Sequence, residues 1–420
     1  MTAMKWWGWG REDVAFTHAD KPGFRPFVQR VLGVDVDRAP ATTPPLDAFD
    51  VPEPEVPAEL LAALEAAAPA STDPHDRVIH GRGKSLRDLV AQRAGDFGRL
   101  PDVVVRPTGE AACSAIVAAA LEHDAVVIPF GGGSSISGSL EAPRDESRPV
   151  ISVDLGGMDR VLEIDATSRL ARIQAGALGP VIEEQLAAQG FTLGHFPDSF
   201  THSTLGGWIA TRSSGMQSDR YGDVADLVRG LRVATASGLL EVRPVPSTST
   251  GPSVREMVLG SEGRLGIITE ATVHVHRVPA ERTILGYLFP TWEEGVAAMR
   301  DIAASEAAAS VTRVSDAPET AFSFATKKGG GALDALQSLA LKTFLRRAKG
   351  FDVEAMCLSF IGFEGSPRHV KQQRRLVGRI VKAHGGLCIG TGPGELYDQK
   401  KFDTPYIRDH LLDRGVLADV

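Results

Sequence analysis

Apolar and polar positions alternate in short blocks along the central part of the chain, which predicts a mixed fold of strands and helices. Apolar runs of strand length lie at 102–106, 125–128, 151–155, 161–164 and 170–174. Segments with helical spacing lie between or around them, at 86–93, 108–123 and 179–189. Pro180 stands in the first turn of the last segment, a position that suits proline. The alternation ends near Pro279, which we interpret as a domain boundary.

Beyond residue 280 the pattern becomes strand–helix, then strand–helix, which predicts a second α+β domain. The strand-like segments are 283–289 and 355–365, and the helix-like segments are 291–304, 317–350 (interrupted by glycines) and 367–385. Ahead of the central part, residues 35–75 are rich in Pro, Ala, Thr and Asp. They predict a proline-stiffened connection leading into a helix near 58–68, with a disordered linker as the alternative.

Length and charge narrow the class of protein. A chain of 420 residues exceeds one typical core, so we expect two or three domains. The net charge of −8 argues against a nucleic-acid partner, but local basic residues can still form a site for an anionic small molecule. The three cysteines, Cys113, Cys357 and Cys388, lie too far apart to indicate a disulfide framework or a zinc site. We expect a cytoplasmic protein with no membrane span, no signal peptide and no metal.

A glycine loop, PFGGGSS at 129–135, follows an apolar strand. Gly131 and Gly133 fit half of the dinucleotide fingerprint G-x-G-x-x-G, but its third glycine is replaced by Ile136. The Gly-Lys-Ser/Thr ending of a Walker loop is also absent. Consecutive glycines still allow several backbone N–H groups to point at one anion, so we predict a pyrophosphate nest here. A flexible turn is the alternative.

Two further segments share this small-residue character. One is PDSFTHSTLGGWIATRSSG at 197–215, and the other is GSEGRLGIIT at 260–269, so the three are spaced about 65 residues apart. Each lets the backbone approach a ligand closely and offers N–H or hydroxyl donors. Three such segments can converge on one long ligand with a central pyrophosphate. This predicts a flavin dinucleotide.

In this order the motifs PFGGGSS, PDSFTHSTLGG, ATRSSG and GSEGRLGIITEA resemble the flavoproteins of the vanillyl-alcohol-oxidase and p-cresol-methylhydroxylase (PCMH) type. Within that family the chain most resembles the alkyldihydroxyacetonephosphate synthases. The segments that support this branch are MKWWGWG near the start, the stretch from DRVIHGRGKS to VVVRPT, STGPS at 249–253, TRVSD at 312–316 and AKGFD at 348–352. The resemblance covers essentially the whole chain.

The resemblance implies an α+β fold, with a two-subdomain PCMH-type FAD-binding domain followed by an incomplete α+β substrate (cap) domain. We place an N-terminal extension at 1–78, the FAD-binding domain at 79–280 and the partial substrate domain at 281–420. It implies noncovalent FAD and a reaction without net redox change, in which flavin N5 holds a ketose phosphate while a fatty alcohol replaces its acyl group. An FAD-linked oxidoreductase acting on a 2-hydroxy acid such as D-lactate or glycolate, and a flavin-binding fragment without catalysis, remain alternatives. A small-molecule or lipid-phosphate substrate is expected, and contact with a membrane surface and a homodimer stay open.

The resemblance also implies roles for individual residues. Residues 129–135 would hold the pyrophosphate, 198–204 would line the flavin, 211–214 would contact its ribityl or isoalloxazine end, and 262–268 would run along the adenine and ribose. Arg313 would lie in the substrate pocket as the catalytic residue. The expected cofactor-binding residues are Pro129, Phe130, Gly131, Gly132, Gly133, Ser134, Ser135, Asp198, Ser199, Phe200, Thr201, His202, Ser203, Thr204, Thr211, Arg212, Ser213, Ser214, Glu262, Gly263, Arg264, Leu265, Gly266, Ile267 and Ile268.

The family pattern continues beyond the last residues here, YIRDHLLDRGVLADV, with a tyrosine proton donor, a histidine cluster and a phosphate-binding arginine. We find no counterpart of these in the chain. The expectation is therefore a C-terminally truncated synthase, inactive unless the missing segment is supplied.

Several other residues leave alternatives open. His274 and His276 are two positions apart on one strand, so both side chains project from the same face. They could bind a metal as a pair, or the face could be solvated. His195 precedes a flavin segment, and it could have a functional role or form a structural hydrogen bond. Arg212 could serve the cofactor or pair with an acid. The basic run 342–349 could meet phosphate or an anionic membrane, or form a solvated helix face. Trp6, Trp7 and Trp9 could pack over the cofactor domain, or form an apolar tunnel for a lipid chain.

Overall fold

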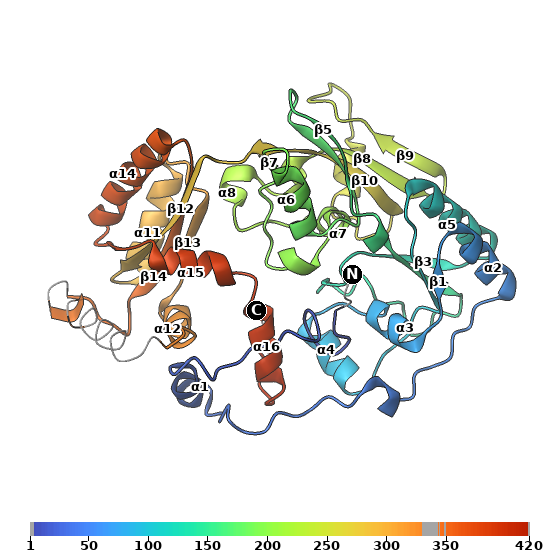
Figure 1. Cartoon of the computed structure of the whole chain (residues 1–420), viewed down its shortest axis with the longest axis horizontal. Coiled ribbons are helices and arrows are strands. Elements are labelled where there is room, and N and C mark those ends of the chain that lie inside the picture. Colours follow the sequence, from blue (N-terminus) through green and yellow to red (C-terminus); the bar gives the residue numbers. More distant parts are fainter. Residues whose placement is uncertain (1–3, 330–342, 344, 348–349, 419–420) are drawn as a thin grey trace. The chain divides into compact units, whose positions relative to one another are not determined.

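The computed structural model describes residues 4–329, 343, 345–347 and 350–418. Its contacts divide the chain into two compact units. Unit 1 comprises Met1–Val14, Thr42–Val278 and Leu417–Val420, and unit 2 comprises Ala15–Ala41 and Pro279–Val416. The expected N-terminal extension is thus shared between the units, because residues 15–41 belong with the C-terminal part of the chain. Figure 1 follows the chain through both units by colour.

Unit 1 begins with a four-stranded sheet in the order β1 (Ala70–Ser71), β2 (Val103–Val105), β4 (Val150–Asp154) and β3 (Val126–Phe130). β4 pairs in parallel with both β2 and β3, and α5 (Glu110–Glu122) forms the crossover between β2 and β3. All three valines of β2 are fully buried, as expected of a strand covered on both faces. α2 (Ala58–Ala67), α3 (Pro74–His80) and α4 (Leu86–Arg93) belong to the same part of the unit.

The second sheet of unit 1 is antiparallel, in the order β5 (Val161–Asp165), β6 (Leu170–Gln174), β10 (Ile267–His274), β8 (Val228–Thr235) and β9 (Gly238–Val242). Between β6 and β8 the chain forms α6 (Gly179–Ala187), β7 (Phe191–Thr192), the 3-10 turn η3 (Phe200–His202), α7 (Leu205–Thr211), α8 (Ser218–Tyr221) and α9 (Val224–Leu227). The remaining elements are α10 (Val254–Val258) and β11 (His276–Arg277), which pairs with β7.

Unit 2 is built on an antiparallel sheet in the order β13 (Val311–Val314), β14 (Cys357–Gly365), β12 (Glu281–Phe289) and β15 (Leu387–Gly390). α11 (Trp292–Ala303) and α14 (Pro367–Ala383) pack on one face, where Phe289, Ile361 and Val377 share a core. A second cluster contains Leu288, Phe351 and Phe360. The unit also holds α1 (Phe24–Leu32), α12 (Ala317–Ala325), α15 (Gly392–Lys400) and α16 (Thr404–Leu412).

The predicted elements agree with the structure over most of the chain. The helix expected at 86–93 is α4, the helix near 58–68 is α2, and the strand expected at 170–174 is β6. Of the helical stretch expected at 317–350, α12 covers 317–325, and 330–342, 344 and 348–349 lie outside the described residues. Sequence patterning missed α1, α15 and α16. Within the described ranges, every helix is too short or too polar to cross a bilayer.

Candidate functional site

The glycine loop follows β3 and is held from one side by the segment 83–84. The backbone N–H of Lys84 donates to the carbonyl of Ser135 at 2.7 Å, and a side chain at position 83 would collide with that same carbonyl. Residues 132–135 donate no backbone hydrogen bond to any part of the chain that the structure describes. This row of free N–H groups is the donor set that a pyrophosphate needs.

The segment 198–204 packs directly against the glycines of this loop. A Cβ on Gly131 would collide with Oγ1 of Thr204, and a Cβ on Gly132 would collide with the carbonyl of His202. Thr204 is also the N-cap of α7, where its Oγ1 accepts from the N–H of Gly207 at 3.2 Å. The glycines are therefore required by close approach of two backbones.

Buried hydrogen bonds fix this second segment in place. Nε1 of Trp208 donates to Oγ of Ser203 at 2.6 Å, and Ser203 Oγ donates to the carbonyl of Ser199 at 2.9 Å. Trp208 and Ser203 are both buried, so neither polar group has water as a substitute partner. Phe200 is buried against α6, where its ring faces Gly179. Ser203 and Phe200 thus stabilise the segment itself.

The remaining predicted segments, 211–214 and 262–268, join the same assembly. The N–H of Glu262 donates to the carbonyl of Ala210 at 2.9 Å, and that of Gly260 to the carbonyl of Ile209 at 3.0 Å. Gly263, at φ +84°, places its Cα against the ring of Pro129, which a Cβ would approach to 3.1 Å. These contacts join 129–135 to 198–204 and to 262–268, and 211–214 follows directly after the two residues that accept from Gly260 and Glu262. Ile267 and Ile268 differ, because their side chains are buried in β10 and serve the core.

Two charged side chains have structural partners here. Nη1 of Arg212 pairs with Oε2 of Glu256 at 2.9 Å, which favours the interpretation of acid pairing. Asp154, the last residue of β4, pairs with His80 and Arg106 at 3.3 and 3.4 Å. Burial alone would raise the pKa of Asp154, but His80 and Arg106 hold it below its usual value.

Sequence reasoning did not single out Gly83, Lys84 and His80, which support the loop. The His80 ring lies 4.1 Å from the ring of Phe130, at the end of β3. The Lys84 ammonium is buried and donates to the carbonyl of Lys5 at 2.6 Å. The available signal was the pair of glycines in HGRGKS at 80–85.

The N-terminal tryptophans pack on this unit. Trp6 is buried and shares a cluster with Phe97 and Phe130. Trp9 is buried with its ring 5.6 Å from that of His202. These contacts favour packing over the cofactor domain.

His195 makes the structural hydrogen bond that was one of its two interpretations. It is 1 % exposed, and its Nε2 lies 2.9 Å from Oγ of Ser213, while its ring meets that of Trp208 edge-on at 4.8 Å. Its Nδ1 has no hydrogen-bond partner among the described residues. Burial lowers the pKa of His195 to about 4.

We expect this buried histidine to weaken the protein in acid. The unfolded chain takes up a proton near the usual pKa of 6.5, whereas the folded chain resists it down to about 4. Stability is therefore complete above pH 6.5 and is lost as the pH falls toward 4. For one proton the slope is at most about 1.4 kcal/mol per pH unit. Urea unfolding at a series of pH values should show a shallower slope in His195→Gln than in the unmodified protein. His75→Gln, at an exposed position, should retain the full slope; equal slopes for all three proteins would contradict the expectation.

His274 and His276 do share a face, with ring centroids 4.6 Å apart. Both are partly buried, and Nε2 of His276 has no hydrogen-bond partner among the described residues, so this is not the solvated face that was one alternative. Burial lowers the pKa of His276 to about 4. The described ranges contain no group of three or more His, Cys, Asp or Glu that could hold a metal ion.

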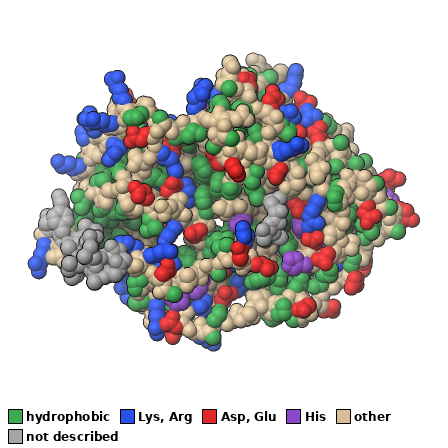
Figure 2. All heavy atoms as spheres, in the orientation of Figure 1, with side chains coloured by type: hydrophobic (Ala, Val, Ile, Leu, Met, Phe, Trp, Pro, Cys, Tyr) green, Lys and Arg blue, Asp and Glu red, His purple; other side chains and the backbone are tan. Residues whose placement is uncertain are grey.

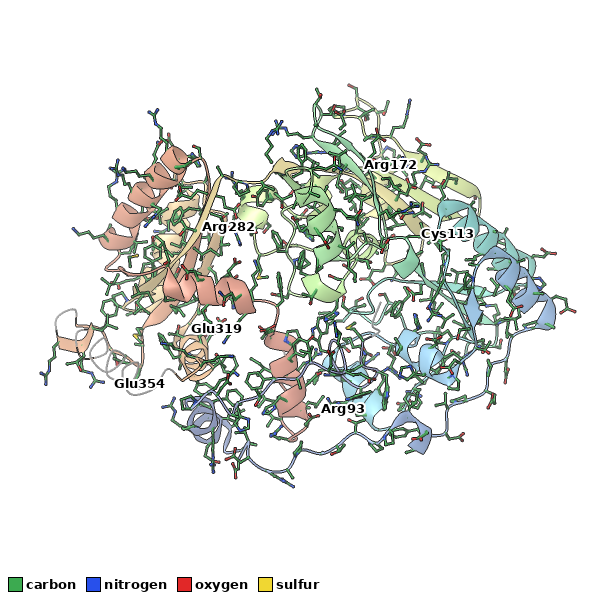
Figure 3. The ribbon with its side chains drawn as sticks, in the orientation of Figure 1. Arg93, Cys113, Arg172, Arg282, Glu319 and Glu354 are labelled. Carbon is green, nitrogen blue, oxygen red and sulfur yellow. The ribbon has the colours of Figure 1, made fainter. Side chains whose placement is uncertain are left out.

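A groove of about 260 Å³ lies elsewhere, on the five-stranded sheet. Its lining includes Arg172 and Arg232 (Figure 3 labels Arg172). Arg172 pairs with Glu270 at 2.8 Å, and Arg232 pairs with Glu110 at 2.7 Å. Because these guanidinium groups are already engaged, the groove offers no anion site comparable to the glycine loop.

Arg313 lies in unit 2, whereas the four predicted cofactor segments belong to unit 1. It is on β13, forms an ion pair with Glu319 at the start of α12 and stands 6.0 Å from the ring centre of Tyr397. Of the basic run 342–349, the structure describes 343 and 345–347, where Leu345 is buried and Arg346 and Arg347 are exposed. The other members of that run lie outside the described residues.

Comparisons with known proteins agree with this geometry. A model of the FAD binding domain matches residues 101–242, and a model of the C-terminal domain of FAD linked oxidases matches residues 278–420. These matches identify FAD as the cofactor and confirm the expected two-domain fold.

Individual relatives point the same way. The chain is 43% identical over 344 residues to alkyldihydroxyacetonephosphate synthase of Dictyostelium discoideum, covering 82% of this chain and 56% of the relative. It is 33% identical to the synthase of Caenorhabditis elegans, covering 99% of this chain and 73% of the relative. A solved alkyldihydroxyacetonephosphate synthase superposes with a TM-score of 0.89 at 37% identity, covering 98% of this chain and 78% of that one.

More distant similarity extends to the mitochondrial D-lactate dehydrogenase [cytochrome] of Arabidopsis thaliana, 28% identical over 79% of this chain and 53% of the relative. The chain spans 56% and 57% of the length of the Dictyostelium discoideum and Trypanosoma brucei brucei synthases. The comparisons give no support to the expectation of C-terminal truncation.

Proposed function

The chain belongs to the alkyldihydroxyacetonephosphate synthase family, and on this premise we propose that it exchanges the acyl group of acyl-dihydroxyacetone phosphate for a fatty alcohol. The product would be an ether-lipid precursor. The observation that carries the proposal is the packing of the glycine loop, whose residues 132–135 keep free N–H groups, against the segments 198–204 and 262–268. Identity of 33–43% to three synthases favours this reaction over the chemistry of more distant flavoproteins.

In this proposal each segment keeps the role expected of it. Residues 132–135 bind the pyrophosphate through backbone N–H groups, and Ser135 is positioned by its contact with Lys84. Residues 198–204 and 211–214 line the flavin, and 262–266 follow the adenine and ribose. When bound, FAD supplies the reactive ring at which the ketose phosphate is activated. The protein supplies orientation, charge and exclusion of water.

We also propose a division of labour between the units. Unit 1 carries all four cofactor segments and so corresponds to the FAD-binding domain. Unit 2 would bind the substrate, with Arg313 in the substrate pocket as the catalytic residue. A cytoplasmic location and a homodimer stay predictions.

Arg313→Met should raise the KM for the acyl-ketose phosphate about tenfold or more while FAD stays bound, because a charge-assisted hydrogen bond is worth about 1.5–3 kcal/mol. Steady-state kinetics would measure this, with circular dichroism as the control for folding. Glu319→Gln is the matched variant, since it removes the ion-pair partner and keeps the guanidinium group. An unchanged KM in Arg313→Met would remove Arg313 from the substrate site.

The direct test of the proposed function is turnover of the holoprotein. Acyl-dihydroxyacetone phosphate labelled in its acyl chain is supplied with a long-chain alcohol, and release of the fatty acid and formation of the alkyl ether are measured. Appearance of both products without net flavin reduction is the expected result. Bound FAD with neither product would contradict the proposal and favour flavin binding without catalysis.

An FAD-linked oxidoreductase of 2-hydroxy acids is the second candidate. It is favoured by the match of residues 278–420 to the FAD linked oxidases and by the similarity to D-lactate dehydrogenase. Anaerobic addition of D-lactate or glycolate would bleach the flavin if this candidate holds. An unchanged flavin spectrum, together with ether formation, would exclude it.

A further inference from the structure

The outward face of α14 in unit 2 carries a concentration of positive charge. The helix contains six Lys or Arg residues and no Asp or Glu. All six are exposed: Arg368, Lys371, Arg374, Arg375, Arg379 and Lys382. Figure 2 shows basic side chains gathered over this helix. The chain as a whole has a net charge of −8, so the positive charge of this face is opposite in sign to the net charge of the protein.

Five of these cations form a straight row, which we call the cationic stripe: Arg368, Lys371, Arg375, Arg379 and Lys382. At 100° per residue they fall within an arc of about 80°, and the row runs for roughly 21 Å. The opposite side of the helix carries Val370, Val377 and Val381, which are buried in the core with Phe289 and Ile361. Packing of that apolar side fixes the stripe outward, so a flat surface could touch all five cations together.

The part of the chain that the structure describes does not neutralise the cations of the stripe. None of them forms an ion pair with any residue that the structure describes. α11 packs beside α14, but its Asp301 is paired with His384 and Arg300. Like charges spaced four apart, such as Arg375 and Arg379, destabilise a helix. An anionic partner would relieve this repulsion.

We propose that the cationic stripe of α14 docks the protein on the anionic phospholipid surface of a membrane. The choice of a bilayer rests on the proposed function, because an acyl-ketose phosphate and a long-chain alcohol both partition into bilayers. A nucleic acid is disfavoured because α14 carries no Phe, Tyr or Trp on which bases could stack.

The negative charge of the rest of the chain does not oppose this docking at physiological salt. The Debye length is about 8 Å at 0.15 M ionic strength, so only groups close to the bilayer feel its potential. Each basic residue near an anionic surface strengthens binding by roughly fivefold. Binding should therefore weaken as salt is added.

The test is sedimentation of the holoprotein with vesicles of phosphatidylcholine alone or of phosphatidylcholine with phosphatidylserine. We expect binding to the anionic vesicles only. Arg375→Glu with Arg379→Glu should lower the partition coefficient at least about twentyfold. The matched control is Arg30→Glu with Arg38→Glu, two exposed positions in the same unit that give the same change of net charge. An unchanged circular dichroism spectrum and urea unfolding curve show that each variant is folded.

Each outcome decides the proposal. Loss of vesicle binding in the α14 variant and its retention in the control support it. Absence of binding by the unmodified protein, or equal binding by both variants, overturns it. So does equally tight binding to single-stranded DNA, which would indicate a general polyanion surface. A change of oligomeric state in the α14 variant without vesicles would instead identify an interface between copies. The vesicle assay measures binding and not turnover. Its result can therefore be interpreted even if the protein does not catalyse the synthase reaction.

Discussion

Gly132→Ala is expected to remove most of the FAD from the protein. The added Cβ would collide with the carbonyl of His202 and come within 3.1 Å of Cα of Ser203. Both obstacles are backbone, so a rotamer change cannot relieve the clash, and residues 129–135 must separate from 198–204. Such overpacking costs about 1–3 kcal/mol, which corresponds to roughly five- to 150-fold in FAD affinity. The flavin-to-protein absorbance ratio after gel filtration, and titration of the apoprotein with FAD, would measure the loss.

Gly378→Ala is the control for this prediction. Gly378 lies inside α14, and a Cβ there would have no neighbour within 4 Å. Alanine is favoured over glycine in a helix by up to about 1 kcal/mol, so this variant should keep its FAD and gain slight stability. If Gly132→Ala bound FAD as tightly as this control, the glycine loop would not be the cofactor site.

Arg282→Met is expected to destabilise unit 2 by about 2–3 kcal/mol. Arg282, labelled in Figure 3, donates from Nε to Glu364 at 2.9 Å and from both Nη atoms to Asp398 at 2.7 Å. Glu364 is only 2 % exposed, so removal of the guanidinium group takes a charge-assisted hydrogen bond from a buried carboxylate. The expected loss lies below that of a fully buried pair because water reaches part of the Arg282 side chain. Urea unfolding, followed by circular dichroism, would measure it.

Arg300→Met makes the same chemical change at an exposed ion pair. Arg300 and Asp301 are 3.2 Å apart, and water surrounds both side chains. The expected loss there is at most about 1 kcal/mol. Equal effects of the two substitutions would mean that burial of Glu364 contributes nothing to the strength of the network.

Local sequence signals predicted the elements whose causes are local. The helix at 86–93 begins at Ser85, whose side chain and that of Asp88 form a capping box. The strand at 103–105 is a run of three valines, a residue favoured in buried strands. The glycine loop was recognisable because a run of glycines and serines directly after an apolar strand is a local pattern. These features follow from a few neighbouring residues, so the sequence alone is sufficient to predict them.

Features that depend on distant partners were missed or left open. Residues 15–41 belong to unit 2 because of contacts such as the N–H of Ala41 with the carbonyl of Asp413, at 2.6 Å. No local pattern could reveal that contact, and the sequence therefore predicted one continuous extension. The same holds for Lys84, whose bond to Ser135 joins residues 51 positions apart.

The sequence by itself determined the family, the cofactor and the segments that contribute to the candidate site. It could do so because runs of small residues in a fixed order can be recognised in the sequence without knowing which contacts they make. The tertiary structure decided which backbone atoms meet, which histidines lose their protons through burial, and which acid neutralises Arg212. It also decided that the cationic stripe of α14 points outward, with no ion pair to the described residues. Burial and proximity are produced by packing between distant segments, so only the folded chain specifies them.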